Sequence, residues 1–333
     1  MTQRIAVLGA GSWGTALANL LALKGVNVVL WSFEAAVAEA INQTRENTHY
    51  LSGIALAPAL RATTDIAEAT ASAQVVVTVN PSQHTRRVLS TAAPHIAKDA
   101  LIISASKGIE TTTLQTMDGV IRDVLPNLRT AYLSGPSFAL EVAQQQPTAV
   151  TAASHSESAA LETQHLFQAP YFRVYTSNDV TGVELGGALK NVIAVAAGMA
   201  AGLGLGHNAR AALITRGLAE IARLGIALGA DPITFMGLAG MGDLILTCTG
   251  DLSRNRTVGM ALGQGKRLPE ILAGMSMVAE GVETARAAHA LANKVGIEMP
   301  IVEQVYQVLF EDLPAAVAVE NLMLREPKPE QWR

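Results

Sequence analysis

The stretch Gly9-Ala10-Gly11-Ser12-Trp13-Gly14 has glycines in the spacing G-x-G-x-x-G and lies between two apolar segments. Residues 4–8 form a short apolar segment, which is typical of a buried strand. Residues 15–23 are rich in Ala and Leu, which favours a helix, and residues 26–31 again resemble a strand. In this setting the first glycine permits a tight turn, the second lets the backbone approach a pyrophosphate, and the third lets the helix pack against the strand. The stretch therefore predicts a dinucleotide-binding βαβ unit, against the alternative of a turn that merely requires glycines.

The composition is that of a globular protein with a large interior. The chain has 333 residues, which favours two domains, and hydrophobic residues make up 50% against 16% for charged residues. A formal net charge of −4 gives no reason to expect a nucleic acid as partner. Cys248 is the only cysteine, which excludes an intramolecular disulfide and a cysteine-based metal cluster. With no basic-then-apolar signal segment at the N-terminus, we expect a cytoplasmic protein.

The order of periodic segments divides the chain into two parts. The first part alternates strand and helix signals, which is typical of a doubly wound parallel sheet of the Rossmann type. The second part shows helical periodicity only, so we place a dinucleotide-binding domain at residues 1–179 and an all-α domain at residues 180–333. After residues 26–31, strands are predicted at 75–79, 100–104, 131–134, 148–153 and 172–175, and the later helices at 183–200, 209–228, 255–262, 282–295, 302–310 and 314–324.

One uncharged stretch resembles a membrane segment. Residues 191–209 carry no formal charge, but glycines interrupt their apolar core. That core is shorter than the roughly 20 apolar residues that a spanning helix needs. The stretch predicts a buried core helix that ends in a glycine-rich loop, and no membrane span.

Two lysines are candidates for chemistry. Lys107 follows a predicted strand in Ser106-Lys107-Gly108, where it could hold an anion or polarise a carbonyl, or could be an ordinary solvated lysine. Lys190 has only apolar, small or amide neighbours, which predicts burial and a lowered pKa, unless its ammonium reaches solvent at a helix edge. The seven histidines are scattered and form no metal-binding motif, so proton transfer is better assigned to a lysine.

A carboxylate and a polar cluster complete the candidate set. Asp243 lies in an apolar run and therefore needs a partner such as Lys190, or else caps a helix after its glycines. Ser253-Arg254-Asn255-Arg256 could clamp a phosphate at a helix N-terminus or could be a solvated helix start.

Seven motifs in order along the chain resemble those of bacterial NAD(P)-dependent glycerol-3-phosphate dehydrogenases. This resemblance spans nearly the full length and implies a Rossmann domain followed by a helical domain like that of 6-phosphogluconate dehydrogenase, with substrate in the cleft between them. The motifs are Gly9-Ala10-Gly11-Ser12-Trp13-Gly14-Thr15-Ala16-Leu17-Ala18, Ser106-Lys107-Gly108-Ile109-Glu110, Leu133-Ser134-Gly135-Pro136-Ser137-Phe138-Ala139, Ala188-Leu189-Lys190-Asn191-Val192, Gly240-Met241-Gly242-Asp243-Leu244, Ser253-Arg254-Asn255-Arg256 and Val278-Ala279-Glu280-Gly281-Val282.

The resemblance also implies roles for individual residues. Lys190 is expected to exchange a proton with the substrate C2 oxygen, with Asp243 in support and Lys107 near both substrate and nicotinamide. Further substrate contacts are implied for Gly135, Ser137, Asn191, Ser253, Arg254 and Asn255. Coenzyme contacts are implied for Gly9, Gly11, Ser12, Trp13, Gly14, Lys107, Ala139, Arg254, Val278 and Glu280.

The implied reaction is hydride transfer between NAD(P)H and C2 of dihydroxyacetone phosphate, which supplies glycerol 3-phosphate for phospholipid synthesis. No metal is expected, and a homodimer is possible. Coenzyme choice stays open, because Ser32-Phe33-Glu34 follows the second strand where the family often carries Arg or His. Phe33 could stack on adenine and Glu34 could repel a 2′-phosphate, although we lean towards use of both NAD(H) and NADP(H). Leu140 stands where relatives often have Lys.

Two other functions compete with this interpretation. A β-hydroxyacid or ketopantoate-type reductase would share the two-domain cleft but would not need Arg254 and Asn255 for a phosphate. A nicotinamide-sensing regulator without chemistry would have no reason to bury a lysine such as Lys190.

Overall fold

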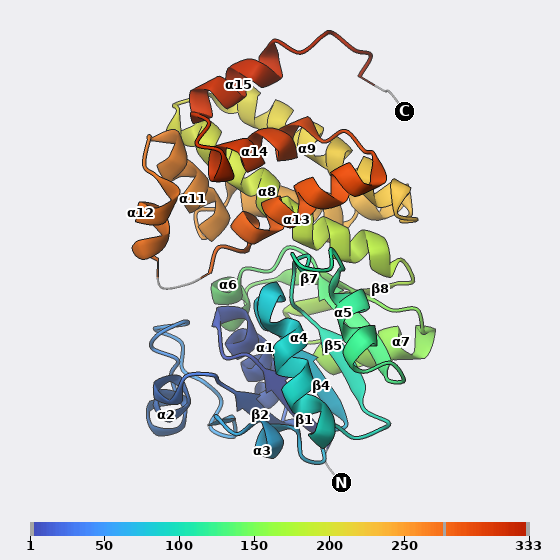
Figure 1. Ribbon diagram of the computed structural model, residues 1–333. Coiled ribbons are helices and arrows are strands. Elements are labelled where there is room, and N and C mark those ends of the chain that lie inside the picture. The colour runs from blue at the N-terminus through green and yellow to red at the C-terminus, as the bar shows by residue number, and fades with distance from the viewer. Residues whose placement is uncertain (1–2, 276–277, 331–333) are drawn as a thin grey trace.

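An eight-stranded sheet occupies the first half of the chain in the computed structural model, which describes residues 3–275 and 278–330 (Figure 1). The strand order is β3-β2-β1-β4-β5-β6-β7-β8, so the chain leaves β1 in both directions, as in a doubly wound fold. The strands are β1 Arg4–Leu8, β2 Asn27–Trp31, β3 Arg61–Thr63, β4 Val75–Thr78, β5 Leu101–Ser104, β6 Arg129–Ser134, β7 Thr148–Ala153 and β8 Phe172–Ser177.

The sheet departs from the predicted parallel arrangement at one point. β7 pairs antiparallel with β6, and β8 pairs parallel with β7, so these last two strands run opposite to the others. The connection from β6 to β7 contains only α6, a helix of five residues. So short a helix cannot carry the chain back along the sheet to the start of a parallel strand. β3, a three-residue edge strand, was absent from the prediction.

Both faces of the sheet are covered. Along β1, Ile5 and Val7 belong to one hydrophobic cluster, whereas Ala6 and Leu8 belong to another. Because alternate residues of a strand point to opposite faces, each face packs against its own helices. The helices of this half are α1 Ser12–Leu23, α2 Ala35–Thr44, α3 Ile66–Thr70, α4 Ser82–Ala92, α5 Met117–Val124, α6 Ala139–Ala143 and α7 Glu157–Phe167, with a 3₁₀ turn η1 at Ala93–His95.

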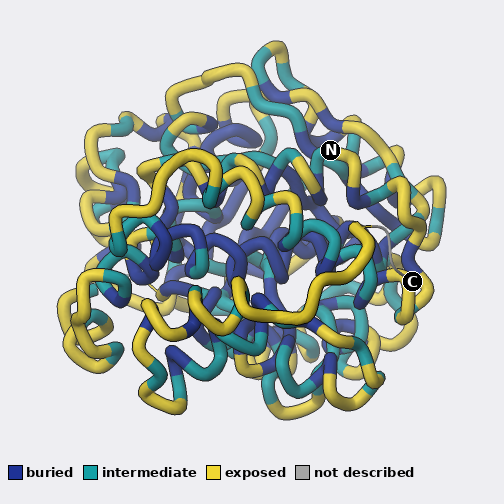
Figure 2. Tube along the Cα trace, turned by 90° about the horizontal axis from the view of Figure 1, so that it is seen from above, coloured by how far each residue is buried: buried dark blue, intermediate teal, exposed yellow. Residues whose placement is uncertain are grey.

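The second half is built around one long helix, α8 (Val180–Gly202). It begins three residues after β8 ends, and the other helices pack around it above the sheet (Figure 1). Seen from above, the middle of this half is buried and its rim is exposed (Figure 2). The remaining elements are α9 His207–Ala227, η2 Pro232–Met236, the π-helical turn η3 Leu238–Gly242, α10 Asp243–Thr249, α11 Arg254–Gly263, α12 Leu268–Ala273, α13 Glu280–Val295, α14 Pro300–Phe310 and α15 Ala315–Met323.

Within the described residues, α8 is the single helix long and apolar enough to cross a bilayer by length and composition. However, 83% of its most apolar window is buried inside the protein. It ends in a loop where Gly204 has a φ of +76°, which confirms the prediction of a core helix closed by a glycine-rich loop. We therefore interpret α8 as the central helix of the second half.

Candidate active site

A cleft of about 670 Å³ lies where the carboxyl ends of the strands meet the helical half. Most of the predicted site residues line it, from both halves of the chain. Gly135 and Asp243 are not part of the lining, but both accept hydrogen bonds from Lys107, which does line the cleft. The predicted residues in the lining are Gly9, Gly11, Ser12, Trp13, Gly14, Phe33, Lys107, Ser137, Ala139, Lys190, Asn191, Ser253, Arg254, Asn255, Val278 and Glu280.

The glycine turn has the geometry that a dinucleotide requires. Gly9 has a φ of +119°, a conformation that side chains disfavour. A Cβ on Gly14 would lie 1.8 Å from the carbonyl oxygen of Gly9, so only glycine allows α1 to pack this closely. A Cβ on Gly11 would meet no atom within 4 Å, because this glycine faces the open cleft. The turn therefore leaves room for a ligand's pyrophosphate beside the first turn of α1.

A buried donor at the same turn also lacks a partner. The indole Nε1 of Trp13 is buried and makes no hydrogen bond to any described residue. Trp13 lines the cleft next to the N-terminus of α1, where unpaired amides and the helix dipole attract anions. An unsatisfied buried N–H is costly, and a phosphate oxygen would satisfy it. The residues present thus fit the pyrophosphate of a dinucleotide.

At the other end of the cleft, two lysines share one carboxylate. Lys190 on α8 donates to Oδ1 of Asp243 at 2.5 Å, and Lys107 donates to Oδ2 at 2.8 Å. Lys107 also donates to the carbonyl of Gly135 at 3.0 Å, which places this backbone atom in the site. The predicted pairing of Asp243 with Lys190 is confirmed, and the carboxylate is a bridge between lysines and not a helix cap.

Burial sets the proton affinity of Lys190. The residue is 7% exposed and Asp243 is 1% exposed. Desolvation lowers the pKa of Lys190 to about 8, and the neighbouring charge of Lys107 adds to this effect, while the carboxylate of Asp243 opposes it. Lys190 is therefore a buried amine that can change protonation state near neutral pH.

Thr247 completes this cluster and was not predicted. Its hydroxyl accepts a hydrogen bond from Lys190 at 2.9 Å and donates to the backbone carbonyl of Asp243 at 2.6 Å. The two residues lie one turn apart on α10, a helix that the sequence analysis did not identify. The sequence signal that could have identified Thr247 is its position four residues after Asp243, which places both side chains on one face of a helix.

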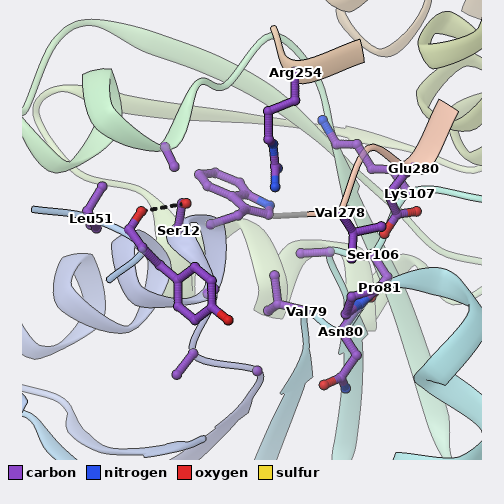
Figure 3. Close-up of a pocket in the computed structure, with 18 of the residues that line it drawn as sticks. Ser12, Leu51, Val79, Asn80, Pro81, Ser106, Lys107, Arg254, Val278 and Glu280 are labelled. Atoms are coloured by element: carbon purple, nitrogen blue, oxygen red, sulfur yellow. Dashed lines mark hydrogen bonds between the residues drawn. The ribbon is translucent and has the colours of Figure 1, made fainter. Parts of the chain in front are cut away.

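The polar cluster at the start of α11 is partly buried: Ser253 and Asn255 are buried, Arg256 is half-buried and Arg254 is exposed. Ser253 is 3% exposed and caps the helix by accepting from the backbone N–H of Arg256. Asn255 donates to Asn191 at 2.9 Å and accepts from the backbone N–H of Gly281 at 2.9 Å. Arg254, in contrast, points into the cleft (Figure 3). A solvated helix start does not describe this cluster, which presents one cation to the cleft.

Glu280 connects the two halves. Its carboxylate accepts from the backbone N–H of Ser82 at 3.1 Å and from the Ser82 hydroxyl at 2.9 Å, at the N-terminus of α4. A Cβ on Gly108 would lie 2.3 Å from the Ser82 hydroxyl. The segment that follows β5 and carries Lys107 can therefore pack against Ser82 only because residue 108 is a glycine. Burial raises the pKa of Glu280 to about 7.

The far end of the cleft is open and lies beyond the glycine turn. Phe33 is 74% exposed at the end of β2. Glu34 accepts a hydrogen bond from the Tyr50 hydroxyl at 2.9 Å, and both residues line the cleft. Tyr50 was missed by sequence reasoning because nothing in its polar surroundings marks it as a ligand contact.

The comparisons with known proteins agree with this geometry. The family model described as the N-terminus of NAD-dependent glycerol-3-phosphate dehydrogenase matches residues 4–160, and the model of the C-terminus matches residues 179–320. A glycerol-3-phosphate dehydrogenase of the NAD(P)+ type from Geobacter metallireducens is 61% identical over 334 residues, covering 99% of this chain and 100% of that protein.

Solved structures distinguish members of this family from proteins that share only its fold. The crystal structure of glycerol-3-phosphate dehydrogenase from Coxiella burnetii has a TM-score of 0.95 at 40% identity and covers 97% of this chain and 99% of its own. A ketopantoate reductase from Ralstonia eutropha has a TM-score of 0.62 at 16% identity, covers 95% of this chain and 100% of its own, and shares the fold alone. The chain belongs to the NAD-dependent glycerol-3-phosphate dehydrogenase family.

Proposed function

We propose that this chain catalyses reversible hydride transfer between NAD(P)H and C2 of dihydroxyacetone phosphate, which yields glycerol 3-phosphate. The chain is a member of an oxidoreductase family that uses NAD(H) or NADP(H). The observation that carries the proposal is the buried Lys190–Asp243–Lys107 cluster at one end of a cleft whose other part fits a dinucleotide.

The coenzyme supplies the hydride and accepts it back in the reverse direction. We propose that the glycine turn, with Ser12 and Trp13, holds its pyrophosphate at the N-terminus of α1. Its nicotinamide half would then reach Lys107, where the cleft meets the cluster. The other residues proposed to contact it are Phe33, Ala139, Arg254, Val278 and Glu280.

The substrate would lie between the lysines and α11. Arg254, the cation that α11 presents to the cleft, is suited to pair with a phosphate at this helix N-terminus. Lys107 would hold the carbonyl end, with Gly135 and Ser137 beside it. Ser253, Asn255 and Asn191 are proposed to complete the pocket. The hydrogen bond from Asn255 to Asn191 orients these two amides, and the Ser253 hydroxyl is oriented by the backbone N–H of Arg256.

Lys190 is proposed to move the proton. As C2 accepts the hydride, negative charge develops on its oxygen, and the Lys190 ammonium donates a proton to it. In the oxidation of glycerol 3-phosphate, the neutral amine removes the proton from the C2 hydroxyl. Asp243 orients Lys190 and stabilises its charged form, and Lys107 adds positive charge near the developing alkoxide.

We also propose that residues 1–179 and 180–333 act as two domains in a cytoplasmic homodimer. Ile233 and Met236 are 74% and 72% exposed on the helical half, which supports a contact between copies. Light scattering of the purified protein would give twice the monomer mass of 34.8 kDa if this is correct.

The activity is tested by comparing substrates that differ only in the phosphate. We expect kcat/KM with NADH to be at least about a hundredfold higher for dihydroxyacetone phosphate than for dihydroxyacetone, because a charge-assisted phosphate contact is lost. Arg254→Gln should remove most of this difference. Equal rates with both substrates, or faster reduction of ketopantoate, would contradict the proposal and favour the fold relatives.

A further inference from the structure

We propose that Glu34 makes this protein select NAD(H) over NADP(H). The inference concerns the end of the cleft opposite Lys190 and deepens the proposed function, on which it rests for the use of a nicotinamide coenzyme. It also goes beyond our expectation that the protein uses both coenzymes, because it gives NAD(H) preference.

Glu34 lies where the adenosine ribose of a bound dinucleotide belongs. β2 runs parallel to β1 and pairs Trp31 with Leu8, so both strands end at the same edge of the sheet. Glu34 precedes the first residue of α2, three residues after β2 ends, and lines the same cleft as the glycine turn. In doubly wound folds an acidic residue after the second strand accepts hydrogen bonds from the ribose hydroxyls.

The carboxylate of Glu34 is held in place by its neighbours. The Tyr50 hydroxyl donates to Oε1 at 2.9 Å, and the Ser32 hydroxyl donates to the Glu34 backbone carbonyl at 2.9 Å. The carbonyl of Tyr50 in turn accepts from the Ser12 hydroxyl at 2.6 Å, the bond drawn at Ser12 in Figure 3. Glu34 is thus tied through Tyr50 to the first residue of α1, beside the proposed pyrophosphate site.

The negative charge of Glu34 is not neutralised. Among residues 3–275 and 278–330, no lysine, arginine or histidine forms an ion pair with it. The Tyr50 hydroxyl donates to Oε1 and the Ser32 hydroxyl makes a long hydrogen bond of 3.5 Å to Oε2, so the carboxylate keeps free acceptor sites. The hydroxyls of an NAD ribose can donate to these sites, whereas NADP has a 2′-phosphate with a charge of about −1.5 to −2 in place of the 2′-hydroxyl. Repulsion and lost hydrogen bonds therefore act in the same direction.

Within the described residues, the positively charged side chains of the cleft lining make no bond to Glu34. Lys107 is engaged by Asp243 at the reaction end. His84 and Arg87 line the cleft from α4, and neither forms a salt bridge or hydrogen bond with Glu34 within the described part of the chain. If Arg87 took up the 2′-phosphate, the purified protein would prefer NADP, which the experiment below detects.

The test is equilibrium binding of NAD+ and NADP+, followed by calorimetry, to the wild-type protein, Glu34→Gln and Glu39→Gln. Glu39 is an exposed residue of the same helix α2 outside the cleft lining, so its variant is a matched control that changes net charge equally. At low ionic strength we expect the wild-type protein to bind NAD+ at least about tenfold more tightly than NADP+. Glu34→Gln should reduce this ratio at least about fivefold, chiefly through tighter NADP+ binding, and Glu39→Gln should leave it unchanged.

Salt provides a second readout. Because the repulsion acts at an exposed site, the wild-type ratio should fall as ionic strength rises, and the Glu34→Gln ratio should change little. Wild-type preference for NADP+, an unchanged ratio in Glu34→Gln, or an equal effect of Glu39→Gln would overturn the proposal. Binding requires no dihydroxyacetone phosphate, so a protein with the expected ratios but no turnover would refute the proposed function and leave this inference intact.

Discussion

At the reaction end of the cleft, charged groups are buried and paired, whereas at the adenosine end a carboxylate lies exposed with a phenol as its partner. Lys190 and Asp243 are 7% and 1% exposed, and Thr247 and Lys107 fix their positions. Glu34 is exposed beside Phe33, which is itself 74% exposed. Buried charges interact strongly and resist screening, while exposed charges interact weakly and respond to salt. In the proposed function, proton transfer would thus occur where electrostatic interactions are strongest, and coenzyme choice where they are weaker.

Removing the buried amine should have the largest effect. In Lys190→Ala we expect kcat for dihydroxyacetone phosphate reduction to fall about a thousandfold, because the general acid is lost. NADH affinity should stay within about twofold, because the dinucleotide contacts are elsewhere and Asp243 keeps Lys107 as its partner. Steady-state kinetics and NADH titration measure the two quantities. If a small primary amine added to Lys190→Ala partly restores turnover, the variant is folded and lacks only the proton-transfer group. Normal turnover of Lys190→Ala without any added amine would contradict the assignment.

Neutralising the shared carboxylate should have the next largest effect. Asp243→Asn leaves two lysines without their counter-charge, one of them buried, so we expect unfolding free energy to fall by about 3 kcal/mol. The pKa of Lys190 should fall further, which lowers the fraction of ammonium and reduces kcat for reduction about a hundredfold. Denaturant unfolding and steady-state kinetics provide the readouts. Glu39→Gln, at an exposed position of α2 outside the cleft lining, is the control, and we expect both its stability and its kcat with NADH to match the wild type. Equal losses in the two variants would break the contrast between buried and exposed carboxylates.

The sequence was most informative where local pattern and burial coincide. The glycine spacing between two apolar segments predicted the turn at the start of α1, and the apolar surroundings of Lys190 and Asp243 predicted that both are buried and paired. These inferences succeeded because an isolated charge in an apolar environment needs a partner. The doubly wound order followed from alternating strand and helix signals and is confirmed by the strand order.

Other features depend on contacts that no local pattern records. The bridge from Lys107 to Asp243 joins residues 136 positions apart, and the bond from Glu280 to Ser82 joins residues 198 apart. The reversal of β7 depends on how far α6 extends, which short-range periodicity does not specify. Tyr50 reaches Glu34 because the loop that carries Asn47 and Tyr50 is hydrogen-bonded to the start of α1, a contact that local periodicity does not predict.

The most direct test of the central claim, that Lys190 exchanges the proton, is the pH dependence of kcat in both directions. Burial lowers the pKa of Lys190 to about 8. Reduction of dihydroxyacetone phosphate requires the ammonium, so its kcat should be constant below that pKa and fall as pH rises through it. Oxidation of glycerol 3-phosphate requires the neutral amine, so its kcat should rise through the same pH and then level off. Profiles that are flat between about pH 7 and 9, or that change in the same direction, would contradict the account.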